Sequence, residues 1–134
     1  MKYKIKKIYE VEKDNYEGYK IVLQQGEKIK KLEILINNGQ DCCEEFGYIC
    51  SEDNFKDFIG AKILEIKTTG TKKSTKLINN PDFTKSLDEG DIMFLTLKTS
   101  KGVIQFAVYN AHNGYYGHEA QIIIDDEVVE NEYL

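Results

Sequence analysis

Eleven consecutive residues, 109–119, concentrate side chains that can stack on a ligand or hydrogen-bond to it. The segment contains both histidines of the chain, together with three tyrosines, two asparagines and two glycines. Imidazole, amide and phenol groups donate and accept hydrogen bonds, and aromatic rings offer faces to a planar ligand. This composition predicts a ligand-binding loop, with contacts from Tyr109, His112, Asn113, Gly114, Tyr115, Tyr116 and His118.

A second segment, 41–48, adds Cys43 and Glu44 to the predicted ligand-binding residues. Cys42, Cys43, His112 and His118 are all residue types that bind zinc. Adjacent cysteines in a strand point to opposite faces, however, so both do not easily reach one ion, and no metal site is predicted. Cys43, a histidine and Glu44 have the residue types of a catalytic thiol triad. No signature of a cysteine hydrolase surrounds them, however. We therefore predict no catalytic residue and no cofactor, and a small hydrolase stays the least favoured alternative.

The two glycines of the loop, Gly114 and Gly117, have a purely structural interpretation beside the functional one. Glycine adopts positive φ without strain, so both residues can serve only to shape a tight corner on which Tyr115 and Tyr116 pack. The same corner also lets backbone N–H groups approach a ligand. No phosphate-binding loop or dinucleotide fingerprint is present.

Length and charge limit the class of protein. A chain of 134 residues predicts a single domain, 1–134, with a core of its own. The net charge of −5 argues against binding to a nucleic-acid duplex, because duplex-binding proteins carry basic patches. All 18 basic residues are lysine, so any phosphate ligand has to be held without the forked arginine guanidinium. The many Lys, Asn, Ile and Tyr residues are typical of AT-rich genomes.

The three cysteines indicate the compartment. An odd number that includes an adjacent pair is a poor disulfide framework, and the N-terminus alternates lysine with apolar residues instead of forming a signal peptide. No apolar run approaches the roughly 20 residues of a membrane span. We expect a cytoplasmic protein with no membrane partner.

Alternation of apolar and polar residues dominates the rest of the chain. Strands are expected over 2–11, 18–24, 30–36, 61–67, 91–99, 102–108, 120–124 and 128–134, and 42–50 is a further strand or inner loop. Segment 51–60 reads as one helix, capped by Ser51 and stopped by Gly60, while 68–90 reads as a long loop. The predicted fold is mainly β (α+β): a curled or partly closed antiparallel sheet with one short helix packed on it.

Two elements of the chain resemble those of a known family. The run Asp41-Cys42-Cys43 and, about seventy residues later, Asn113-Gly114-Tyr115-Tyr116-Gly117 are similar to the D-C-C and N-G-Y-Y-G elements of a family of small uncharacterised bacterial and phage domains. The resemblance spans roughly residues 30–125. It implies the fold more directly than the activity. Size, composition and all-β build also resemble phage anti-defence sponges, which sequester the cyclic nucleotide signals of an antiphage system.

These observations predict a non-enzymatic phage or prophage protein that sequesters a small nucleotide, such as a cyclic dinucleotide, in its 109–119 loop and acts as a homo-oligomer. The alternative from a different class is an acidic protein–protein inhibitor that docks on a basic host defence protein. A cleft lined by tyrosines favours the first, and a flat acidic face favours the second.

Overall fold

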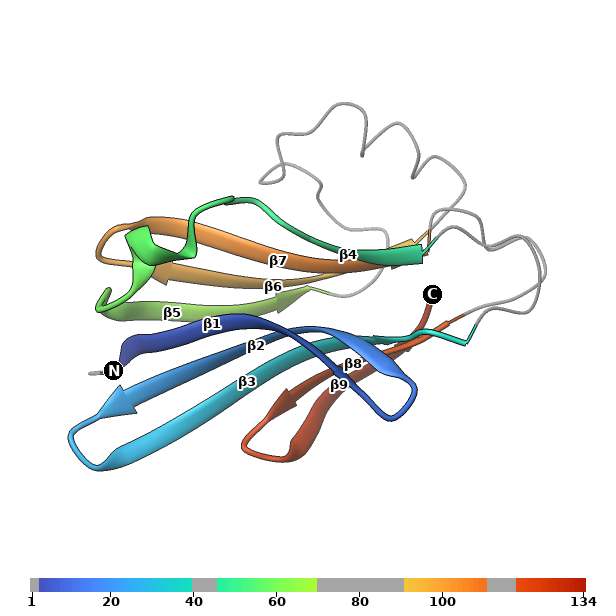
Figure 1. The fold of residues 1–134 in the computed structure, drawn as a ribbon, viewed down its shortest axis with the longest axis horizontal. Coiled ribbons are helices and arrows are strands. Elements are labelled where there is room, and N and C mark those ends of the chain that lie inside the picture. Colours follow the sequence, from blue (N-terminus) through green and yellow to red (C-terminus); the bar gives the residue numbers. More distant parts are fainter. Residues whose placement is uncertain (1–2, 40–45, 70–90, 111–117) are drawn as a thin grey trace.

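The computed structural model describes residues 3–39, 46–69, 91–110 and 118–134, and these ranges contain nine strands and one short turn of 3-10 helix (Figure 1). The elements are β1 (Lys4–Lys13), β2 (Tyr16–Gln25), β3 (Lys28–Asn37), β4 (Phe46–Cys50), η1 (Phe55–Phe58), β5 (Ile63–Thr69), β6 (Asp91–Thr99), β7 (Gly102–Asn110), β8 (Glu119–Ile124) and β9 (Glu127–Tyr133). All strand pairs are antiparallel.

Five strands form the first sheet, in the order β1-β2-β3-β8-β9. Its hairpins turn at residues that tolerate positive φ: Asp14 between β1 and β2, Gly26 between β2 and β3, and Asp125 with Asp126 between β8 and β9. The strands expected over 18–24, 30–36, 120–124 and 128–134 are confirmed as β2, β3, β8 and β9. The pairing of β3 with β8 joins residues far apart in the chain, with Ile34 opposite Ile122.

Four strands form the second sheet, in the order β4-β7-β6-β5. The strands expected over 91–99 and 102–108 are confirmed as β6 and β7, which form a hairpin with a turn at Ser100-Lys101 and Gly102 at φ 121°. The strand over 42–50 is confirmed for β4, whereas residues 40–45 lie outside the described residues. Most of the predicted 68–90 loop also lies outside them.

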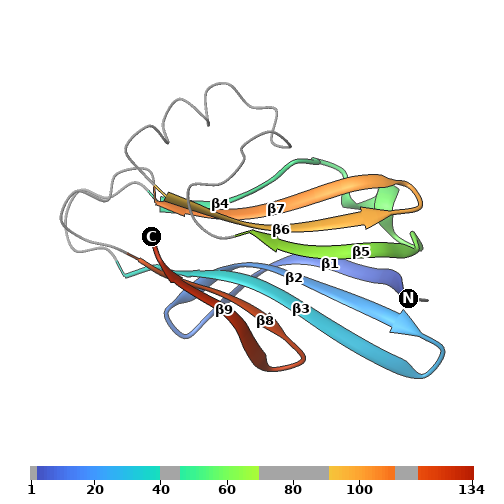
Figure 2. The same ribbon diagram turned by 180° about the vertical axis from the view of Figure 1, so that it is seen from behind.

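The two sheets pack face to face. The four-stranded sheet lies above the five-stranded one in Figure 1, and Figure 2 shows the same arrangement from behind. Alternate residues of both sheets meet in one core, to which Ile21, Ile34, Leu95, Phe106 and Ile122 contribute fully buried side chains. At one edge the sheets touch through their backbones, because the N–H group of Ile5 donates to the carbonyl of Ala61 over 2.9 Å.

The mainly β class is confirmed, but two parts of the predicted architecture are wrong. The strands form two separate sheets that do not close, instead of one curled or partly closed sheet. The helix expected over 51–60 is only the 3-10 turn η1. Ser51 does not cap a helix, because its N–H group donates to the carbonyl of Gln105 and its hydroxyl accepts from the Gln105 N–H group. Asn54 caps η1 instead, and Phe58 still packs into the core.

None of the helical structure in the described ranges is long and apolar enough to cross a membrane.

Candidate functional site

The structure describes two of the residues predicted to bind a ligand. Tyr109 and His118 flank the gap in the described ranges, whereas His112, Asn113, Gly114, Tyr115, Tyr116, Cys43 and Glu44 lie outside them. The predicted loop site therefore stays a prediction.

His118 lies inside the molecule, with 2% of its surface exposed. Its ring stacks on Phe46 with centroids 4.2 Å apart, and its Nδ1 lies 2.7 Å from the carbonyl oxygen of Asn37. Its backbone exchanges two hydrogen bonds with Leu134. The amide Nδ2 of the buried Asn110 donates to the same Leu134 carbonyl. His118 thus holds the start of β8 against β4 and against the end of the described chain.

Tyr109 lies on the opposite side of the second sheet from the main core. It is half-buried and packs against a small apolar cluster of Ile92, Phe94 and Ala107. The two described members of the predicted loop site therefore belong to different layers. The His118 ring lies between the two sheets, stacked on Phe46, whereas Tyr109 lies on the outer side of the second sheet.

A cleft of about 280 Å³ opens elsewhere, where β4 faces the β1–β2 hairpin. Here the core gives way to polar groups, because Glu10 of β1 lies opposite Tyr19 of β2 on the inner face of the sheet. Tyr48 and Cys50 approach from β4. We call this space, lined also by Glu52, Asp53 and Phe55, the β4 cleft.

Aromatic rings form the floor of the β4 cleft. The buried Tyr19 packs edge-on against Tyr48, with centroids 5.1 Å apart, and edge-on against Phe55 at 6.0 Å. Tyr48 and Phe55 are both half-buried, so parts of their rings remain accessible to a ligand. Phe106 packs behind Tyr19 and fixes its ring from the core side.

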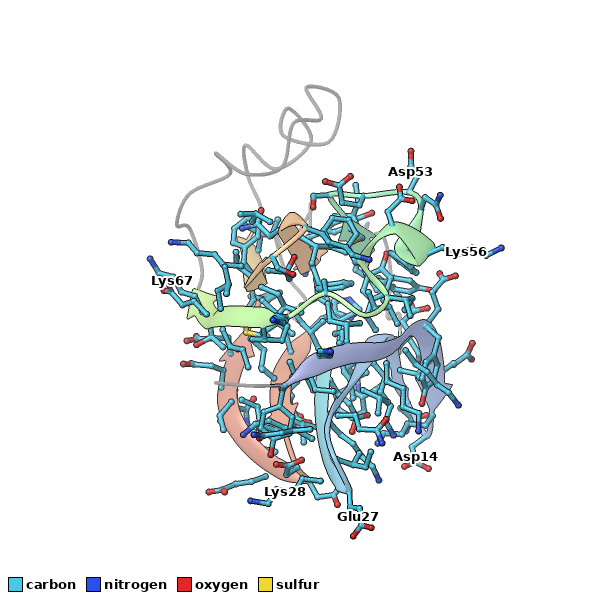
Figure 3. All side chains as sticks on the ribbon, turned by 90° about the vertical axis from the view of Figure 1, so that its left-hand side faces the viewer. Asp14, Glu27, Lys28, Asp53, Lys56 and Lys67 are labelled. Carbon is cyan, nitrogen blue, oxygen red and sulfur yellow. The ribbon has the colours of Figure 1, made fainter. Side chains whose placement is uncertain are left out.

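Carboxylates form the rim of the β4 cleft. Glu10 contributes from β1, and Glu52 and Asp53 contribute from the connection after β4. Burial and a hydrogen bond to Glu10 raise the pKa of Tyr48 to about 12, so its phenol is neutral and donates to the carboxylate. In Figure 3, Asp53 and Lys56 project from the molecule in different directions beside η1, and the two side chains form no ion pair.

Cys50 is the cysteine that the structure describes, and it is a free thiol. Burial raises the pKa of this thiol to about 12. A thiol is nucleophilic only as the thiolate, so Cys50 is inert at neutral pH. Its sulfur is one more soft, weakly polar atom in the wall of the cleft.

No group of three or more His, Cys, Asp or Glu side chains within the described ranges is arranged to hold a metal ion. The carboxylates of the β4 cleft surround the aromatic floor and do not converge on one point. The zinc arrangement considered for Cys42, Cys43 and His112 lies outside the described residues.

A second depression, of about 350 Å³, lies near the start of β1. Lys4 and Lys6 line it together with Gln24, Ile59 and the two glycines Gly26 and Gly60. No carboxylate of the described ranges lines this depression, so the charge of its described lining is opposite to that of the β4 cleft. We call it the lysine depression.

Sequence reasoning missed the β4 cleft. Its residues are spread over β1, β2, β4 and the connection to η1, and none of them stands in a motif. One signal was present: Glu17 alternates in phase with Tyr19, Ile21 and Leu23, so a carboxylate occupies a core-facing position of β2.

The chain belongs to the domain family of unknown function DUF7448, whose family model matches residues 2–122. The expectation that the chain belongs to a family of domains without an assigned function is confirmed. No curated protein matches the chain, and no solved structure matches it.

Proposed function

We propose that the protein is a non-enzymatic binding protein that holds its ligand in the β4 cleft. The observation that carries this proposal is the combination of an accessible aromatic floor with a carboxylate rim in one concave space. Binding sites are concave and combine aromatic side chains with polar groups that orient the ligand. The β4 cleft contains both, and its lining is more polar than apolar.

The chemistry of the cleft supports binding without catalysis. The Cys50 thiol is protonated at neutral pH, and Tyr48 is held as a neutral donor. Nucleophilic catalysis requires a base within hydrogen-bond reach of the nucleophile, and among the described residues no histidine lines the cleft. The small size of the space suits one chemical group, such as a side chain or the head of a small metabolite.

A screen by two-dimensional NMR tests the proposal on the intact chain. The tyrosine rings carry ¹³C labels, and a Tyr48→Phe variant identifies the Tyr48 signal. The panel contains small amines, quaternary ammonium ions, carboxylates, phosphates and neutral alcohols. We expect at least one class to shift the Tyr48 signal in a saturable way.

Tyr9 is the matched internal control. It lies on β1 next to Glu10, but its exposed ring is on the outer face of the sheet. A ligand of the β4 cleft leaves the Tyr9 signal in place. If no class gives a saturable shift at Tyr48, or if Tyr9 shifts equally with every compound, the proposal is wrong.

The nucleotide-sequestering function stays a second proposal, in which a phage or prophage protein withholds a cyclic nucleotide from a host defence system. Among the described residues, the lysine depression has the charge that favours a phosphate. Calorimetric titration with cyclic dinucleotides tests this proposal, with Lys4→Ser/Lys6→Ser as the variant and Lys67→Ser, on β5, as the control. The absence of binding heat across the panel would count against it.

A further inference from the structure

The β4 cleft carries more negative charge than its rim alone. Glu10, Glu52 and Asp53 line the cleft, and Glu12 and Glu17 lie beside it on the inner face of the β1–β2 hairpin. The ion pairs formed within the described residues, Lys13–Glu33 and Lys98–Glu65, include none of them.

Glu12 and Glu17 are directly opposite each other in the β1–β2 register. Like charges in this position destabilise a pair of strands. Burial first, and then the charge of Glu12, raises the pKa of Glu17. The apo protein therefore holds like charges together at a cost, and a bound positive charge relieves that cost.

The aromatic floor decides which kind of positive charge fits. A small metal ion needs several oxygen ligands that converge at short distance, and the described carboxylates form no such group. An organic cation instead makes favourable contact with the face of an aromatic ring within about 6 Å of its centroid, and nearby carboxylates strengthen the attraction. Tyr48 and Phe55 offer accessible ring surface directly below the rim.

We infer that the β4 cleft binds an organic cation: a primary or methylated ammonium group on a short alkyl chain, seated on Tyr48 and Phe55 and surrounded by Glu10, Glu52 and Asp53. This inference rests on the proposed function, because it names the ligand class of the same cleft. The overall charge of −5 attracts such a ligand from a distance.

Two sources can present this chemistry: a free small amine and the lysine side chain of a partner protein. Both place the same ammonium group at the end of an alkyl chain, and they differ in what flanks it. A free amine binds by itself. A partner's lysine also needs contacts from its neighbouring residues to the rim.

The test compares a cation with a neutral molecule of the same shape. Choline and 3,3-dimethylbutan-1-ol differ in that a carbon replaces the charged nitrogen. Both are titrated into the full chain, and the Tyr48 signal is followed by NMR. We expect choline to bind about 2- to 30-fold more tightly than the alcohol, the range expected for a cation on an aromatic face.

Charge variants locate the effect. Glu10→Gln should weaken choline binding by about two- to fivefold, as expected for one solvent-accessible charge pair. It should leave the binding of the alcohol unchanged. Glu127→Gln, an exposed carboxylate at the start of β9, is the control and should change neither.

Further arms distinguish the two sources. Butylamine and the blocked tripeptide Gly-Lys-Gly are titrated beside Gly-norleucine-Gly, which lacks the ammonium group. Binding of butylamine as tight as that of the lysine peptide supports a free amine. Binding of the lysine peptide alone supports a partner's side chain, and either result supports the inference.

The failures are also distinct. If the alcohol or an anion binds at Tyr48 as tightly as choline, the inference is overturned while the proposed binding function stands. If neither the cations nor any other class binds at Tyr48, both are overturned.

Discussion

Gly18, in the second strand of the five-stranded sheet, is the position where one added methyl group should do most harm. It is buried and lies between Val11 of β1 and Leu35 of β3. A Cβ atom built on Gly18 would lie 1.9 Å from the carbonyl oxygen of Ile34 and 2.9 Å from its carbonyl carbon. Both atoms belong to the backbone of β3, so no side chain can move aside, and the strands themselves must separate.

The magnitude follows from this geometry. Forcing extra volume into a packed site costs about 1–3 kcal/mol. Separating β2 from β3 at Gly18 also weakens at least one hydrogen bond of the ladder, which contributes about 1 kcal/mol. We expect Gly18→Ala to lower the free energy of unfolding by about 2–4 kcal/mol, a large share of the roughly 5–15 kcal/mol that stabilises a domain. Urea denaturation followed by circular dichroism measures this change.

Gly47→Ala is the matched control, since Gly47 also lies in a strand and its closest neighbour is the end of the Tyr109 side chain, at 3.1 Å. The end of the Tyr109 side chain has to shift by only a few tenths of an ångström to make room. This variant should therefore change stability by less than about 1 kcal/mol. Equal effects of the two substitutions, or a loss below about 1 kcal/mol for Gly18→Ala, would refute the reasoning.

Three further predictions concern the core and the charges. Phe106→Ala removes a fully buried ring and should cost about 3–5 kcal/mol in chemical denaturation, where a loss under about 1 kcal/mol contradicts its core position. Lys13→Met removes the cation 3.0 Å from the buried carboxylate of Glu33 and should cost about 1–3 kcal/mol, most of which Lys13→Met/Glu33→Gln restores; an unrestored double variant argues against the ion pair. The pKa of Glu17 is raised in the folded protein, so ionisation of its carboxyl group destabilises the fold. This destabilisation is present above the pKa of the unfolded state, which is about 4.3. Glu17→Gln should therefore raise the free energy of unfolding at pH 7 by about 0.2–1 kcal/mol, measured as a higher melting temperature. This gain should vanish near pH 3, and a gain independent of pH contradicts the prediction.

The strands and their hairpins were predictable because their signals are local. Glycine at 26 and 102 and aspartate at 125 and 126 stand at the turns, and each adopts positive φ there. Alternating apolar residues lie on both sides of each turn, so strand, turn and strand can be read from a short window of sequence.

The division into two sheets was not predictable, because it depends on distant pairings. β3 pairs with β8 across a long stretch of chain, and the alternation of Leu32, Ile34 and Ile36 would be the same in one curled sheet. The helix prediction failed for a related reason. The local signals around Ser51 favour a helix cap, but Ser51 instead forms two hydrogen bonds with Gln105 of β7, directly after the end of β4.

The β4 cleft was hidden by a change of phase in β1. The register shifts between Ile5 and Lys7, so the core-facing positions run Ile5, Ile8 and then Glu10. Strict alternation from Ile5 puts Glu10 on the solvent face, where an acidic residue is unremarkable. Only the register with β2 shows that Glu10 and Glu12, although exposed, continue the inner face.

Acidic residues on an inner face have two physical explanations, and Glu17 separates them. Inward-pointing charges on an edge strand protect it from pairing with other chains, and this accounts for Glu10 and Glu12, because β1 is an edge of its sheet. It does not account for Glu17, since β2 is paired on both sides, with β1 and with β3. Glu17 adds a repulsive partner to Glu12 without protecting an edge. Departures from the rules that stabilise a fold are expected where function requires them, which favours the cation-binding role of the inner carboxylates over protection of the edge.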